Sequence, residues 1–89
     1  RYVRKGKIEA IASFHGVSAE IIEYTIQKEN HLVRKTLRDL NFPEGALIVG
    51  VIRDGKGVIP DSDFQLNVDD KVIIFVLPEA IKKIESMFK

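Results

Sequence analysis

The chain has 89 residues, which is the size of one small domain. Lysine and arginine number 14 against 13 aspartates and glutamates, so the chain lacks the basic excess typical of nucleic-acid-binding proteins. It has no cysteine, which excludes disulfides and thiolate sites and fits a reducing cytoplasm. The longest apolar run, residues 72–77, is far shorter than the roughly 20 residues of a membrane helix. The only methionine is Met87, so we expect a piece cut from a longer protein.

The N-terminal part predicts a helix end followed by two strands. Residues 1–7 are basic, and cations favour helix C-termini, so we expect the solvated tail of a helix here rather than a lipid or nucleic-acid contact. Residues 8–14 and residues 20–28 each alternate apolar and other side chains, which is strand spacing. The intervening Gly16 suits a hairpin turn between these two strands.

A short helix is predicted next. Val33, Leu37 and Leu40 are spaced as one helical face. Thr36 and Asp39 resemble a capping box in which aspartate replaces glutamate, so we expect only about one helical turn.

The remaining residues predict three strands and a closing helix. Residues 46–53 (ALIVGVIR) are apolar on both faces, which is typical of a buried central strand. Asp54-Gly55 predicts a type I′ hairpin turn that leads into a strand at residues 56–60. Residues 71–77 predict a second buried strand, and Pro78 suits the first position of the final helix. The inner stripe of this helix is expected to consist of Ile81, Ile84 and Phe88.

This order of elements predicts the α+β class, because strands and helices do not alternate regularly. We expect two layers: a small mixed or antiparallel sheet of four to five strands, packed against a short helix and a C-terminal helix.

No catalytic or metal site is predicted. A calcium loop starting at Asp61 fails, because Val72 stands where the ligand glutamate is required. His15 and His31 lie in predicted loops without the spacing of a helical metal pair. No serine lies in a nucleophile elbow, so we do not expect an enzyme.

Five segments in series carry a family resemblance. They are EIIEYTI (20–26), TLRDL (36–40), GALIVGVIR (45–53), GKGVIP (55–60) and DKVIIF (70–75). Together they resemble the TrkA-C family, the C-terminal regulatory half of the domains that regulate conductance of potassium. The resemblance spans about residues 19–89, and residues 1–18 are expected to be a connector and an N-terminal strand from the preceding domain. Asp69 stands where the family commonly has glycine, and Ser62 stands in a turn that often has one.

The resemblance implies a cytoplasmic regulatory domain that forms a homodimer or higher oligomer. It would associate peripherally with a membrane potassium-transporter subunit and transmit ligand state to that subunit. NAD(H) or an adenine nucleotide is expected in an upstream domain, and no cofactor is expected in this chain. Some family members bind cyclic di-AMP in the dimer cleft. The alternative is a ligand-free dimerisation or scaffold module.

The resemblance also supplies candidate residues for a ligand site and a dimer interface. Counting against a cyclic dinucleotide, Glu44 is negative and no arginine stands beside it to pair with phosphate. Structural packing by Phe42 and Pro60 is the other interpretation of these positions. The ligand candidates are Asn41, Phe42, Ile48, Ile59 and Pro60, and the interface candidates are Ile48, Val49, Gly50, Ile59 and Pro60.

Overall fold

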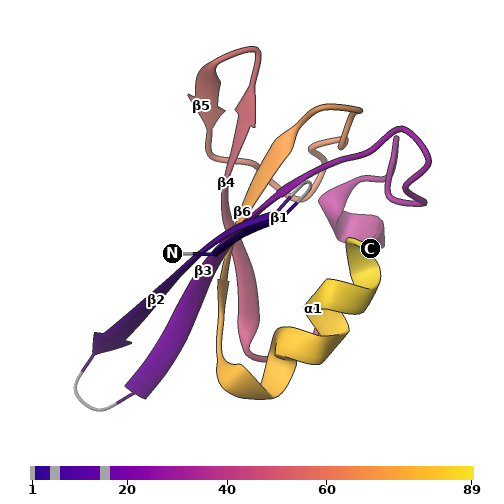
Figure 1. Cartoon of the computed structure of the whole chain (residues 1–89). Helices are drawn as coiled ribbons and strands as arrows, with labels where there is room; N and C mark the ends of the chain where they lie inside the picture. The colour runs from indigo at the N-terminus through magenta and orange to yellow at the C-terminus, as the bar shows by residue number, and fades with distance from the viewer. Residues whose placement is uncertain (1, 5–6, 15–16) are drawn as a thin grey trace.

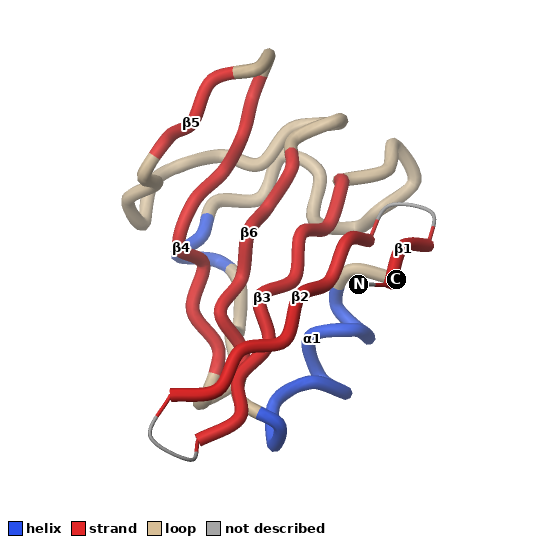
Figure 2. Tube along the Cα trace, turned by 60° about the vertical axis from the view of Figure 1, so that its left-hand side comes forward, coloured by secondary structure: helices blue, strands red, loops and turns tan. Residues whose placement is uncertain are grey.

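The computed structural model describes residues 2–4, 7–14 and 17–89, with side chains from residue 18 onward. Its centre is one antiparallel sheet in the order β1-β2-β3-β6-β4-β5 (Figure 2). A second layer, made by the C-terminal helix and the segment between β3 and β4, covers one face of this sheet (Figure 1). The α+β, two-layer prediction is confirmed. The strands are β1 (Tyr2–Arg4), β2 (Lys7–Phe14), β3 (Val17–Thr25), β4 (Ala46–Arg53), β5 (Lys56–Val58) and β6 (Lys71–Val76).

The N-terminal part differs from the expected helix tail. Residues 2–4 form β1, which pairs with β2 in the register Val3 to Ile8, so the helix prediction is wrong. Tyrosine and valine favour strands, and the free edge of β2 offers their backbone groups hydrogen-bond partners. The strand predicted at residues 8–14 is confirmed as β2, whereas β3 begins three residues before the predicted residue 20. The expected turn at Gly16 lies outside the described residues.

The core lies between β3, β6, β4 and the helical layer. In β6, Val72, Ile74 and Val76 are fully buried, while the residues between them face the other side of the sheet. Each such side chain contributes about 1.5–3 kcal/mol of transfer free energy when it is buried. This alternation predicts the inner face correctly, and the same core includes Ile22, Tyr24, Ile26, Leu32, Val51, Leu66, Ala80, Ile84 and Phe88.

The helical elements are short. The segment predicted as a helix near residues 33–40 forms only the 3-10 turn η1 (Leu37–Asp39), where Thr36 Oγ1 donates to Asp39 Oδ2 at 2.9 Å rather than capping the backbone. Pro78 opens η2 (Pro78–Ala80), which continues into α1 (Ile81–Met87). At the end of α1, the ring of Phe88 stacks on Tyr24 with 4.8 Å between centroids. This contact fixes the helix to β3.

The turns at Asp54-Gly55 and at Asp69 have left-handed backbone conformations. Asp54 and Gly55 have φ of 53° and 78°, so the type I′ hairpin between β4 and β5 is confirmed. Asp69 has φ of 73°, a left-handed conformation that glycine adopts at less cost. Within the described residues, no helix has the length and apolar character needed to cross a membrane.

Candidate functional site

The candidate residues on β4 are arranged around a β-bulge. Ile48 pairs with Ile74 of β6 and Gly50 pairs with Ile73, so Val49 is the extra residue on β4. Ile48 packs against the core, whereas Val49 is 40% exposed. Consecutive strand residues face opposite sides of a sheet, so this difference needs no bulge. The bulge instead lets both Ile48 and Val51, three residues apart, face the core.

The ligand candidates lie in different environments. Phe42 packs edge-on against Phe88, with 6.5 Å between the ring centroids, and Ile48 packs against the same core. Asn41 is exposed, and Pro60 is half-buried. Ile59 is 85% exposed. Packing within the domain thus explains why Phe42 and Ile48 are apolar. The contacts that the structure describes do not explain why Ile59 is apolar.

Ile59 and Pro60 lie next to the bulge of β4. Val58 pairs with Val51, and the Val58 carbonyl oxygen is 3.7 Å from the position that a Cβ on Gly50 would take. The chain therefore leaves β5 beside Gly50, which brings the two groups of interface candidates to the same edge of the sheet.

The prediction that β4 is a central strand buried on both faces is wrong. β4 lies second from the end of the sheet, and its Leu47 side chain is 63% exposed. Leu47 pairs with Phe75 of β6, and Phe75 pairs with Ile21 of β3, so these residues form one apolar row. The row lies on the outer face of the sheet, opposite the helical layer. The sequence pattern shows that both faces are apolar but does not show whether a layer of the same domain covers each face.

An ion pair that the sequence analysis missed joins β4 to the start of β6. Arg53 Nε donates to Asp70 Oδ1 at 2.8 Å, and Arg53 Nη2 donates to Asp70 Oδ2 at 2.6 Å. The Asp70 side chain is only 2% exposed, whereas that of Arg53 is 31% exposed. The hydrogen bond to Asp70 is the main cause that raises the pKa of Arg53.

The same pair organises the loop between β5 and β6. Arg53 Nη2 also donates to the Gln65 carbonyl at 2.8 Å, and the Asn67 amide donates to Asp70 Oδ2 at 2.8 Å. The guanidinium lies 4.5 Å from the centroid of the Phe64 ring. Because Arg53 is held by these contacts, the β4–β5 hairpin is fixed to this loop.

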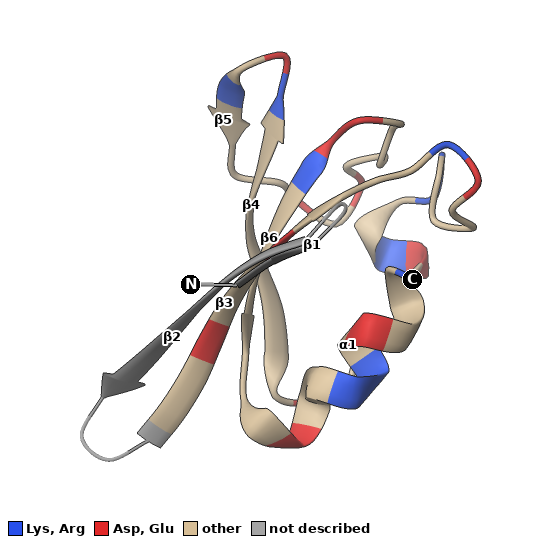
Figure 3. Cartoon of the chain, viewed as in Figure 1, with Lys and Arg blue, Asp and Glu red and all other residues tan. Residues whose placement is uncertain are grey.

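Charged residues lie mostly in the turns, at the ends of the strands and along α1 (Figure 3). The stretch of β4 at residues 46–50 carries none. His31 is exposed, and His15 is outside the described side chains. Among the described residues, no three histidine or carboxylate side chains gather as a metal site would require. The remaining feature of this surface is its apolar character, at Leu47, Val49 and Ile59.

Comparison with known proteins identifies the family. The TrkA-C domain model matches residues 21–89. The chain belongs to the TrkA-C family. A solved chain described as "Structure of RCK domain with cda" has the same fold, with a TM-score of 0.66 and 21% sequence identity over 78% of this chain and 97% of that chain.

Two curated relatives of this TrkA-C domain are much longer than the chain itself. The Trk system potassium uptake protein TrkA homolog 2 of Methanosarcina mazei is 42% identical over 92% of this chain and 18% of its own length. The Trk system potassium uptake protein TrkA of Azorhizobium caulinodans is 32% identical over 100% of this chain and 19% of its own length. The TrkA-C domain described here therefore spans about a fifth of the length of each of these two relatives.

Proposed function

We propose that this chain is a cytoplasmic, dimerising regulatory domain that senses a ligand and transmits its state to the membrane subunit of a potassium-uptake system. It acts by regulation and not by catalysis. The observation that carries the proposal is the exposed apolar surface at Leu47, Val49 and Ile59, in a domain whose other face is well covered. Apolar surface of this kind is typical of interaction sites. Membership of the TrkA-C family and the names of its relatives support the link to potassium uptake.

The physical basis of the signal is a difference in affinity. A ligand in the cleft of a dimer changes the angle between subunits only if it binds one arrangement more tightly than another. Cyclic di-AMP is the first ligand to test, with Ile59 and Pro60 as its apolar wall. In the whole protein, NAD(H) or an adenine nucleotide would bind in an upstream domain.

A second candidate function is a dimerisation module without a ligand. It is favoured by Phe42 and Ile48, since packing against the core of the domain itself accounts for their apolar character. The interface would be the same in both functions. Only the sensing step differs.

Thermal unfolding of the chain with its oligomeric state followed in parallel separates the two functions. The panel is cyclic di-AMP, NADH, ATP, calcium and magnesium. A compound that binds only the folded form stabilises it by about 2.7 kcal/mol at a hundred times its dissociation constant. A rise of the midpoint with cyclic di-AMP supports the sensor. A dimer that responds to no member of the panel supports the ligand-free module and assigns nucleotide sensing to another part of the protein.

A further inference from the structure

Glu20 is the only charged residue that β3 places on the inner face of the sheet. Ile22 and Tyr24 follow it on the same face and are buried in the core. The Glu20 side chain is half-buried, and its Oε1 atom is closed off from solvent. In the part of the chain that the structure describes, no donor forms a hydrogen bond with this oxygen. One oxygen of a carboxylate therefore lies at the margin of the core without a partner.

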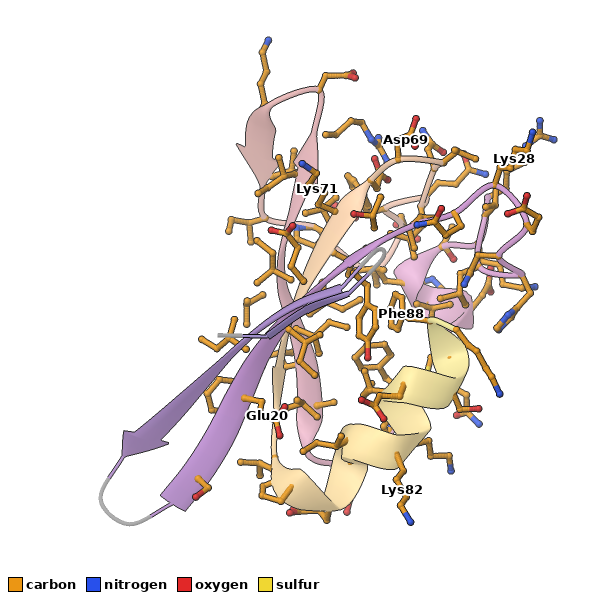
Figure 4. All side chains as sticks on the ribbon, in the orientation of Figure 1. Glu20, Lys28, Asp69, Lys71, Lys82 and Phe88 are labelled. Atoms are coloured by element: carbon orange, nitrogen blue, oxygen red, sulfur yellow. The ribbon has the colours of Figure 1, made fainter. Side chains whose placement is uncertain are left out.

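The residues nearest to Glu20 on this face are apolar. In the sheet, Val76 of β6 and Ile11 of β2 stand opposite Glu20, and neither residue type has a side-chain donor. β3 also contacts η2, whose Ala80 is 2% exposed. Figure 4 shows Glu20 beside β6, near the end of the sheet at which η2 begins. The carboxylate therefore lies close to the contact between the sheet and the helical layer.

Charged residues of the neighbouring elements do not compensate Glu20. The inner face of β6 carries none. On β2, Glu9 pairs with Ile22 and so lies on the same face, but a carboxylate is not a donor. Glu20 forms no ion pair with the charged residues of η2 and α1, which are Glu79, Lys82, Lys83 and Glu85. A negative charge on Glu20 therefore has no partner among its described neighbours.

We propose that Glu20 makes the packing of the helical layer on β3 sensitive to protons. Protonation leaves a neutral carboxyl group, whereas ionisation brings an uncompensated charge to the contact between β3 and η2. Burial without a donor disfavours the charged form. Ionised Glu20 therefore favours separation of η2 and α1 from the sheet, because water then reaches the carboxylate. This inference goes beyond the proposed function and does not depend on the dimer.

The direction of the effect follows from where the proton is bound. In the unfolded chain Glu20 is in water and loses its proton at about pH 4.3. In the folded chain it keeps the proton to higher pH, because the ionised form lacks a donor. Between these two pH values the folded state binds more protons than the unfolded state. The free energy of unfolding therefore falls as the pH rises through this window, with no further loss above it.

Thermal unfolding as a function of pH tests the inference. E20Q removes the charge and keeps the shape of the side chain, and E20M also removes the polar group. The midpoint of each variant, relative to the wild type, should rise by about 4–8 °C between about pH 4 and about pH 8. E23Q is the matched control, because Glu23 lies on the same strand but faces the other side of the sheet. It should follow the wild type at every pH. A difference that does not change with pH in either Glu20 variant would overturn the proposal.

Hydrogen exchange shows which part of the domain responds. Exchange of the α1 amides, corrected for the intrinsic effect of pH, should be faster in the wild type than in E20Q at about pH 8 and equal at about pH 4. A change spread evenly over sheet and helix would overturn the assignment to the helical layer. E9Q examines the other carboxylate on this face. If E9Q removes the pH dependence and E20Q does not, the titrating group is on β2 and the inference for Glu20 is wrong.

Discussion

Arg53 and Asp70, which are 17 residues apart in the sequence, form a bidentate ion pair with nitrogen-to-oxygen distances of 2.8 and 2.6 Å. The pair connects the end of β4 to the start of β6. Because the Asp70 carboxylate is buried and also accepts the Asn67 amide, its partner cannot be removed without leaving a buried charge.

R53M should therefore destabilise the domain by about 2–3 kcal/mol, below the full cost of breaking a buried pair because Arg53 is partly exposed. Urea unfolding measures the change. Because the pKa of Arg53 is raised, the contribution of the ion pair to the free energy of unfolding is lost only at strongly alkaline pH. This contribution should therefore be constant through neutral pH.

The matched control for this variant is R38M. Arg38 Nη2 contacts Asp63 Oδ1 at 2.7 Å, but these side chains are 62% and 76% exposed. An exposed pair contributes about 0–1 kcal/mol, so R38M should cost much less than R53M. Equal costs would show that burial of Asp70 does not control the strength of the Arg53 pair.

Asp69 has a left-handed backbone, with φ of 73°. A non-glycine residue in this conformation costs roughly 1–2 kcal/mol, less for aspartate than for most residues. D69G should therefore raise the free energy of unfolding by up to about 1 kcal/mol. N67G, two residues earlier and without a positive φ, should lower it. A loss of stability in D69G would contradict the strain assigned to this turn.

Gly45 precedes β4 with φ of 91°, and a Cβ there would lie 3.4 Å from the Ala80 Cβ and from Glu79 Oε2. G45A should destabilise the domain by about 1–2 kcal/mol, because alanine disfavours this backbone conformation. Gly57 has ordinary φ, and a Cβ added there would meet no neighbour within 4 Å, so G57A should be neutral or slightly stabilising. Thermal midpoints of the two variants make the comparison.

Phe88 secures the C-terminal helix through its ring contacts with Tyr24 and Phe42. Figure 4 shows its side chain at the end of α1, among the aromatic rings between helix and sheet. F88A should cost about 3–5 kcal/mol, as expected for an aromatic ring removed from a core. K82A, on the exposed side of the same helix, should change stability little. Hydrogen exchange of the α1 amides would show whether the helix detaches first.

Local patterns predicted much of this fold. The strand at residues 46–53, the Asp54-Gly55 turn and Pro78 at the start of the closing helical segment are all encoded within a few residues. Pairing over long distances in the sequence was not predictable in this way. The Arg53–Asp70 pair required the register of β4 against β6, which no local pattern supplies.

The exposure of the outer sheet face could not be predicted from the sequence, for a physical reason. An apolar strand face has the same sequence pattern whether its own domain or a partner covers it. The exposure of Leu47 was missed because β4 was interpreted as buried on both faces. The ligand and interface roles of all the candidates stay predictions, namely those of Asn41, Phe42, Ile48, Val49, Gly50, Ile59 and Pro60.

The most direct test of the account is sedimentation equilibrium of the wild-type chain over a wide range of concentrations, with and without cyclic di-AMP. The account predicts a reversible dimer, and a ligand bound in the two-fold cleft should lower its dissociation constant by linkage. A dimer unaffected by the ligand would retain the interface and contradict the sensing role of cyclic di-AMP. A monomer at every concentration would contradict the central claim.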